Sequence, residues 1–110
     1  MIQFVVGWVK KTFFHFSTVE EFEPVETVTA SRRGYNFEHD ELKSLMVRLE
    51  RFETVEFTDV YGTSLTSESI DKRFGKDGGI DCVIHIVAPT EKGAKNVAAR
   101  IRNIIVKGDY

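Results

Sequence analysis

The sequence is poor in cysteine and proline, and it has no long apolar run. The single cysteine among 110 residues, Cys82, excludes an intramolecular disulfide and a cysteine-based zinc site. No apolar stretch approaches the roughly 18–20 residues that a membrane-spanning helix requires, so no membrane partner is expected. Hydrophobic content of 42% beside 29% charged residues is ordinary for a globular fold and argues against disorder. We therefore expect a single folded domain over residues 1–110.

The first residues do not have the pattern of a signal peptide. The apolar stretch over residues 2–9 has no basic leader, and Lys10 and Lys11 interrupt it. We expect an intracellular, cytoplasmic protein, in which the lone thiol stays reduced.

The N-terminal region is typical of β-strands. Residues 2–9 and 12–16 are short, rich in β-branched and aromatic side chains, and without helical period. We predict two strands joined by a tight turn at Lys10 and Lys11. One continuous, bent strand is the alternative, because Lys-Lys is not a favoured turn pair.

The next segment combines a helix signal with a strand signal. Ser17 and Glu20 have the spacing of a capping box, which predicts a short helical turn that Pro24 ends. Residues 25–33 alternate loosely between apolar and polar, which predicts a further strand stopped by Gly34.

Two helices are predicted by apolar residues three and four positions apart. One covers residues 37–52 with Asn36 as its N-cap, and the other covers residues 91–106 with Thr90 as its N-cap, behind Pro89. The apolar stripes are Leu42, Leu45, Met46, Leu49 and Phe52 in the first helix, and Ala94, Val97, Ala98, Ile101, Ile104 and Ile105 in the second.

Two strands and a long polar segment lie between these helices. Residues 54–60 predict a half-buried strand, and residues 80–88 predict a central strand that is apolar on both faces. Residues 62–79 are long for a plain loop, so we expect them to be functional, mobile or partly helical around 68–74. Together the elements predict an α+β fold, with a mixed or antiparallel sheet of about five strands and two main helices packed on one face. The ferredoxin-like fold or a related two-layer sandwich fits this order.

Two helices cover only one face of such a sheet, whereas the N-terminal strands are apolar on both faces. A monomer would then expose more apolar surface than the few hundred Å² that monomers usually show in one patch. Either the sheet curls, or residues 18–28 fold over it, or a protein partner or second copy covers it. The candidate interface residues are aromatic anchors of the kind enriched at interfaces: Phe4, Trp8, Phe13, Phe14 and Phe16.

The net charge of −2 hides a segregation of charge along the chain. Glutamates gather at residues 20–26, whereas the last helix has a basic face opposite its isoleucine stripe. That face consists of Lys92, Lys95, Arg100, Arg102 and Lys107. It could contact nucleic-acid phosphates or an acidic partner, although amphipathic helices also have such a face as ordinary solvated surface.

The histidines and the cysteine give only weak signals for catalysis. His15, His39 and His85 have no second histidine at metal-ligand spacing, and Cys82 is expected to pack inside a strand. The glycine-rich residues 75–79 precede a strand, whereas a phosphate-binding loop follows one. We predict no catalytic residue, no metal ligand and no cofactor.

Three segments nevertheless occur in the order of a nuclease core. Glu38 precedes a helix, residues 53–58 form the next strand, and a glycine-rich turn leads to a strand with Asp81. This order is similar to that of Mrr-like restriction nucleases over about half the chain. The resemblance implies that Glu38 and Asp81 would hold Mg²⁺ and activate water at a phosphodiester. The family's next element, a strand with Glu or Gln two residues before Lys, is replaced here by Pro89 and a helix.

The sequence thus favours a small non-enzymatic interaction module, either an assembly subunit or a protein-binding inhibitor or adaptor, that uses its aromatic N-terminal region. One alternative is a nucleic-acid-binding domain that acts through the basic C-terminal helix. The other is a degenerate Mrr-like, Mg²⁺-dependent nuclease. The expected partner is a protein or a second copy of the chain.

Overall fold

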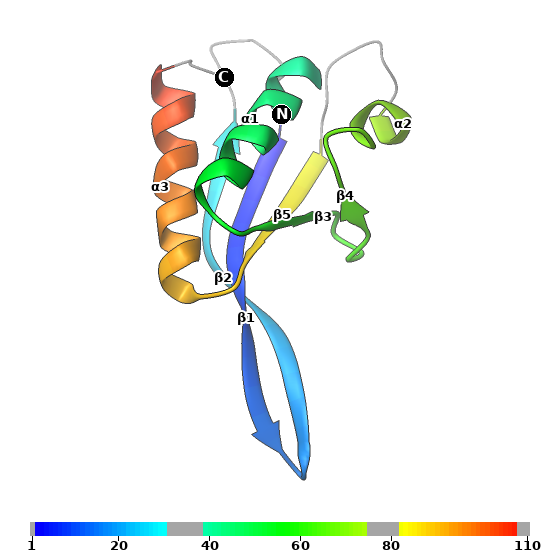
Figure 1. Cartoon of the computed structure of the whole chain (residues 1–110), viewed down its shortest axis with the longest axis vertical. Coiled ribbons are helices and arrows are strands. Elements are labelled where there is room, and N and C mark those ends of the chain that lie inside the picture. Colours follow the sequence, from blue (N-terminus) through cyan, green and yellow to red (C-terminus); the bar gives the residue numbers. More distant parts are fainter. Residues whose placement is uncertain (1, 31–38, 75–81, 108–110) are drawn as a thin grey trace.

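The computed structural model describes residues 2–30, 39–74 and 82–107. In chain order the elements are β1 (Ile2–Phe14), β2 (Ser17–Ala30), α1 (His39–Phe52), β3 (Glu56–Thr58), β4 (Ser64–Leu65), α2 (Ile70–Phe74), β5 (Cys82–Ala88) and α3 (Glu91–Lys107). The strands form one five-stranded sheet in the order β2-β1-β5-β3-β4 (Figure 1). β1 and β5 are parallel and the other neighbours are antiparallel, so the sheet is mixed.

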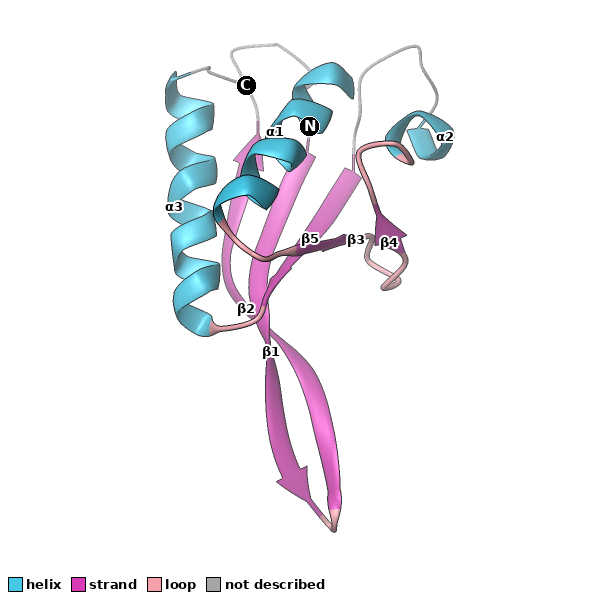
Figure 2. Cartoon of the chain, in the orientation of Figure 1, coloured by secondary structure: helices cyan, strands magenta, loops and turns pink. Residues whose placement is uncertain are grey.

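The two long helices, α1 and α3, lie on the same face of the sheet, and the short α2 lies near β4 (Figure 2). This arrangement confirms the predicted α+β sandwich with two main helices on one face. A hairpin joins β1 directly to β2, whereas the ferredoxin-like order places a helix between its first two strands, so the fold is the related two-layer sandwich. Among the described residues, no helix is long and apolar enough to span a membrane.

The core lies between the sheet and the two helices. The parallel register sets Phe4 beside Ile84 and Val6 beside Ile86, and all four side chains are fully buried. The helices contribute Leu42, Leu45, Met46 and Leu49 from α1, and Ala94, Val97, Ala98 and Ile101 from α3. Burying each large apolar side chain stabilises the fold by about 1.5–3 kcal/mol. Both predicted stripes are confirmed except at Phe52, which is 55% exposed at the end of α1.

The predicted turn at Lys10 and Lys11 is wrong, and the alternative of one continuous strand is confirmed. β1 runs through both lysines, and the chain reverses at His15 and Phe16, whose φ angles are 48° and 63°. Two successive positive φ angles are the geometry of a type I′ hairpin turn, whose twist matches that of the strands. The aromatic sequence concealed this turn, because such turns usually contain Asn and Gly.

The predicted helical turn after Ser17 is also wrong. Residues from Ser17 onward pair with β1 in register, from Phe14 opposite Ser17 to Ile2 opposite Ala30. Cross-strand pairing therefore overrides the local capping-box signal. The Ser17 hydroxyl donates instead to the carbonyl of Phe14, at 3.0 Å.

A bulge lies where the hairpin leaves the body of the protein. The β1–β2 register shifts between Val6 and Gly7, and Pro24 lies opposite Gly7. β2 is an edge strand, which tolerates the missing N–H of proline. The Phe22 ring crosses over Gly7 and stacks on His85 of β5, with ring centroids 5.1 Å apart and planes 7° from parallel. Phe22 thus covers part of the sheet face that has no helix.

The other local predictions are largely confirmed. The segment after residue 62 is partly structured by β4 and α2, as the partly helical alternative predicted. The Gly93 N–H donates to the hydroxyl of Thr90 at 3.0 Å, so Thr90 is the N-cap of α3. The predictions made for Gly34, Asn36 and residues 75–79 lie outside the described part of the chain.

Candidate protein interface

The β1–β2 hairpin extends beyond the rest of the sheet as a two-stranded arm (Figure 1). The last pair between β1 and β5 is Trp8 with Ala88, whereas β1 remains paired with β2 as far as Phe14. Every residue from 10 to 21 is exposed, because neither face of the arm has another layer against it. We call residues 9–22 the arm.

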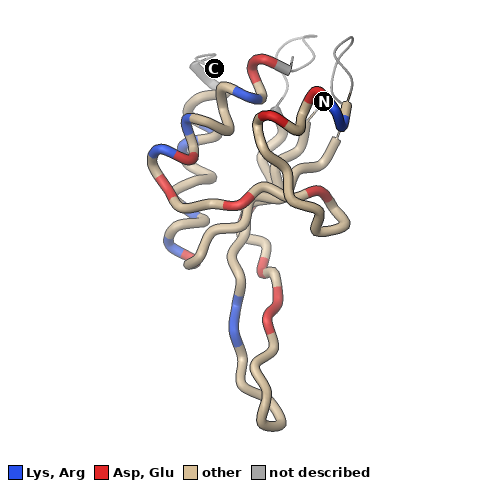
Figure 3. The backbone as a smooth tube through the Cα atoms, turned by 45° about the vertical axis from the view of Figure 1, so that its right-hand side comes forward, with Lys and Arg blue, Asp and Glu red and all other residues tan. Residues whose placement is uncertain are grey.

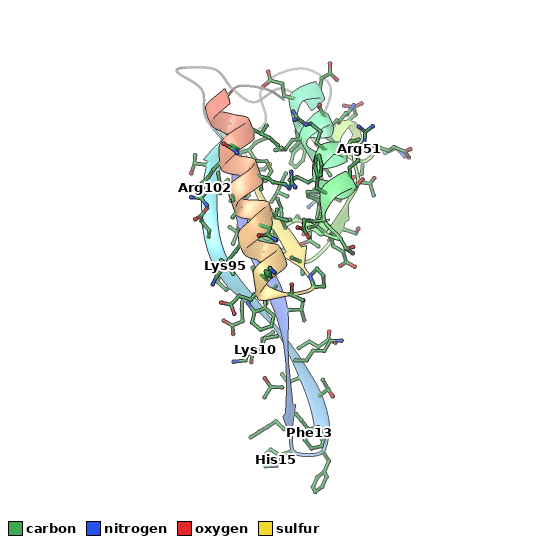
Figure 4. The ribbon with its side chains drawn as sticks, turned by 60° about the vertical axis from the view of Figure 1, so that its left-hand side comes forward. Lys10, Phe13, His15, Arg51, Lys95 and Arg102 are labelled. Carbon is green, nitrogen blue, oxygen red and sulfur yellow. The ribbon has the colours of Figure 1, made fainter. Side chains whose placement is uncertain are left out.

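The end of the arm is a cluster of exposed apolar side chains. Phe13, Phe14 and Phe16 are 72%, 60% and 95% exposed, and Val19 beside them is 39% exposed. The rings of Phe14 and His15 meet edge to face, with centroids 4.0 Å apart. Figure 4 shows Phe13 and His15 at the far end of the hairpin, away from the helices. We call these five residues the aromatic tip; a cluster of this kind on a projecting element is typical of an interaction site.

The charges on the part of the arm between the tip and the body, which we call the shaft (residues 9–12 and 20–22), compensate each other. Lys10 lies opposite Glu21 and Lys11 opposite Glu20, with the Lys11 ammonium 3.8 Å from the Glu20 carboxylate. Figure 3 shows the basic positions along one strand of the arm and the acidic positions along the other. Cross-strand pairs of opposite charge stabilise a hairpin by a few tenths of a kcal/mol to about 1 kcal/mol. Because neither sign dominates, the shaft does not have the charge pattern of a phosphate-binding surface.

Two of the five predicted interface aromatics belong to the body of the protein instead. Phe4 is fully buried in the core, so its prediction as an interface residue is corrected: a partner cannot reach it in the folded chain. Trp8 is half-buried, packs against the core and lines a pocket together with Pro24 and Lys95. Of the five, only Phe13, Phe14 and Phe16 are exposed at the end of the arm.

His15 and Val19 are members of the aromatic tip that the sequence did not indicate. The capping-box spacing predicts a helical turn that includes Val19, and His15 gives only a weak signal for metal binding or catalysis. A correct placement of the turn would have identified both, because it puts His15 in the turn and Val19 opposite Thr12, next to the phenylalanines.

The basic face of α3 is engaged by other parts of the chain. The Lys95 ammonium lies 3.3 Å from the Glu91 carboxylate, one helical turn earlier. Arg102 Nε lies 2.9 Å from the carboxylate of Glu26, which links α3 to β2. Figure 4 shows Lys95 and Arg102 on α3, on the side nearest β2.

The other predicted residues of that face differ in their surroundings. The Arg100 guanidinium lies over the Phe52 ring, 3.9 Å from its centroid, which links α3 to α1. Lys92 is exposed, and the side chain of Lys107 is outside the described part of the chain. Arg100 therefore points toward α1 and Arg102 toward β2, and both side chains contribute to the packing of α3. Nucleic-acid binding by this face stays a prediction.

One carboxylate of the body, that of Asp59, is buried and fully paired. Its Oδ1 accepts the N–H groups of Tyr61 and Thr63, both at 2.9 Å, and Arg73 of α2 pairs with its other oxygen. Burial by itself raises the pKa of Asp59, but these hydrogen bonds and the Arg73 charge outweigh it and hold the pKa below its ordinary value of 3.8. Asp59 thus joins the β3–β4 turn to α2, which is a structural role.

The described residues contain no group of three or more His, Cys, Asp or Glu side chains that could hold a metal ion. Glu38 and Asp81, the carboxylates implied by the nuclease resemblance, lie outside them, so that alternative stays a prediction. No family model, no curated protein and no solved structure matches this chain. Of the surfaces described, the aromatic tip has the chemistry most typical of a protein-binding site. It is an exposed apolar surface, and the charges on the adjoining part of the arm cancel.

Proposed function

We propose that this protein is a non-enzymatic protein-interaction module that contacts its partner through the aromatic tip of the β1–β2 arm. The observation that supports this proposal is the exposure of Phe13, Phe14 and Phe16 on an element that projects from the body. Phenylalanine is enriched at protein interfaces, and a rigid aromatic side chain loses little conformational entropy when it is buried.

The size of the tip suits a specific contact. Each phenylalanine gains about 1.5–3 kcal/mol when it is moved fully from water into an apolar environment. Burying three such side chains favours binding by several times this amount, but association costs at least about 4 kcal/mol because the two molecules lose translational and rotational freedom. The tip alone therefore supports weak binding, and a stable complex also needs backbone or shaft contacts from the arm.

The experiment compares three proteins immobilised at equal density: the unaltered chain, a tip variant with Phe13→Ser, Phe14→Ser and Phe16→Ser, and a Tyr61→Ser control. Tyr61 is 86% exposed, but it lies in the β3–β4 turn, far along the chain from the arm. We expect the proteins captured from solution, whether further copies or foreign chains, to be lost with the tip variant and kept with the control. Circular dichroism checks that all three are folded. Capture that is unchanged in the tip variant would contradict the proposed function.

A further inference from the structure

One edge of the arm has no neighbouring strand in the described part of the chain. β5 accompanies β1 only as far as Trp8, so the edge of β1 that faces β5 is open from Val9 to the turn at His15. The outer edge of β2 differs, because it contains Pro24 and four glutamates at positions 20, 21, 23 and 26. Proline and charge on an edge strand oppose the addition of another strand. The open edge of β1 has two lysines, Lys10 and Lys11, but no proline, so it is the better of the two edges for strand addition.

We propose that a second copy of this chain occupies this edge, with the two β1 strands antiparallel and centred on Thr12. The two arms then form one four-stranded sheet in the order β2-β1-β1-β2. This inference rests on the proposed function and names its partner.

The length of the open edge sets the register. The two-fold axis that relates two antiparallel strands runs perpendicular to the sheet, so each residue has its side chain on the same face in both copies. Residues directly opposite each other also share a face. The residue at the axis must therefore lie opposite its own counterpart in the other copy. The edge runs from Val9 to His15, and its midpoint is Thr12. With this centre, the turn of each copy reaches Val9 of the other, where β5 ends. Each open edge is thereby filled along its whole length.

The side-chain pairs in this register are compatible. Thr12 lies opposite Thr12, Lys11 opposite Phe13, and Lys10 opposite Phe14 of the other copy. Threonine pairs stabilise antiparallel strands, and an ammonium group is attracted to an aromatic face. A centre shifted by one residue to Lys11 would set two lysines directly opposite each other, which is destabilising. Charge thus excludes the shift to Lys11, whereas a centre at Phe13 would leave Val9 and Lys10 beyond His15 of the other copy, so that part of the edge would stay open.

A hollow lies at the place that each tip would reach. It has a volume of about 320 Å³, and its walls include the apolar side chains of Val9, Val55, Val87 and Pro89. The second copy would bring Phe16, the most exposed of the phenylalanines that the structure describes, to this hollow. Complete burial of three phenylalanines from each copy would remove on the order of 1,000 Å² from water, which is the lower limit for a specific interface.

Site-specific disulfides test both the second copy and the register. In a Cys82→Ala background, we expect Thr12→Cys to form a disulfide-linked dimer in air, because directly opposite residues in such a pair have Cα atoms about 4.5 Å apart. Lys11→Cys is the matched control, because Lys11 is also exposed but its counterpart in the other copy is a diagonal neighbour, about 7–8 Å away and out of reach. Non-reducing electrophoresis gives the linked fraction. Equal cross-linking of both variants, or none in the Thr12→Cys variant, would overturn the proposal.

Light scattering over a concentration series gives the second measurement. We expect the dissociation constant of the dimer to rise at least ten-fold in Val55→Arg, whose side chain fills the hollow, and to stay unchanged in Tyr61→Arg. A chain that stays monomeric throughout overturns the inference. If that monomer still captures a foreign protein through its tip, the proposed function stands; if the tip variant captures the same proteins, the proposed function fails too.

Discussion

At the scale of single residues, Gly7 lies at a position of β1 that has no room for a side chain. A Cβ atom built there would lie 2.6 Å from Phe22 Cζ and closer still to the carbonyl oxygen of Glu23. The Glu23 carbonyl is backbone and cannot turn away, so a side chain must displace the strand. Glycine at this site is therefore required by close packing of the chain against itself.

We expect Gly7→Ala to lower the free energy of unfolding by about 1–3 kcal/mol, the usual cost of overpacking. Urea denaturation followed by circular dichroism measures it. Gln3→Ala, an exposed position on the same strand, is the control and should change stability little. An unaltered midpoint for Gly7→Ala would mean that Phe22 does not lie over β1 in solution.

Asp59 should make stability depend on pH in the acid range. The folded chain holds the pKa of this carboxyl below 3.8, so its ionised form stabilises the fold at higher pH. This contribution is fully present above the ordinary pKa and is lost as the pH falls through the lowered one. We expect Asp59→Asn to be less stable than the unaltered chain at neutral pH, and the difference to shrink below about pH 3.8. Thermal melts at several pH values measure this, and a difference that grew on acidification would contradict it.

At the scale of elements, the start of α3 depends on one side chain. Thr90 accepts the Gly93 N–H with its hydroxyl, and its carbonyl accepts the N–H of Ala94 at 3.0 Å. We expect Thr90→Ala to destabilise the protein by about 1 kcal/mol, because one N–H at the helix end loses its partner. Thr90→Ser keeps the hydroxyl and should retain nearly full stability. Denaturant midpoints compare the two variants, and equal losses would show that the hydroxyl is not the cause.

The hairpin turn is an element whose sequence does not suit its geometry. His15 adopts a φ of 48°, which costs a residue with a Cβ more than it costs asparagine or glycine. We expect His15→Asn to stabilise the protein by about 0.5 kcal/mol while leaving all three phenylalanines of the tip in place. Thr18→Asn, in the strand beside the turn, should not stabilise it. A thermal shift assay distinguishes them, and a loss of stability in His15→Asn would indicate that its ring contact with Phe14 matters more than the backbone.

At this scale the sequence predicted the helices well and the hairpin poorly. Helix α1 ends at Phe52 as predicted, and α3 begins at Glu91 and ends within one residue of its prediction, because helical periodicity and the Thr90 cap are local signals. For the arm, the sequence predicts the wrong turn and a helical turn that is absent, because Lys10 and Lys11 interrupt the apolar pattern and Ser17 with Glu20 has the spacing of a helix start. Pairing between the two strands, which no local pattern contains, decided both points.

At the scale of the whole molecule, the contacts of α3 bear on the nucleic-acid alternative. Arg102 links α3 to Glu26 of β2, and Arg100 links it to Phe52 of α1. We expect Arg100→Glu combined with Arg102→Glu to lower the melting temperature, because both links are lost and Glu26 then faces a like charge. Melting curves and the anisotropy of labelled DNA at low and high salt measure the two effects. A steep salt dependence of DNA binding that disappears in this variant would favour the alternative instead.

The sequence by itself determined the fold class, the two long helices and the central strand, because periodicity and capping depend on neighbouring residues. Only the tertiary structure decided which aromatic side chains a partner can reach. Phe4 and Phe13 belong to one strand and are chemically identical, yet one is fully buried and the other is 72% exposed. The difference arises because β5 pairs with β1 only as far as Trp8, and every residue from 10 to 21 is exposed. Exposure is set by contacts between distant parts of the chain, so the site became visible only when those parts were placed together.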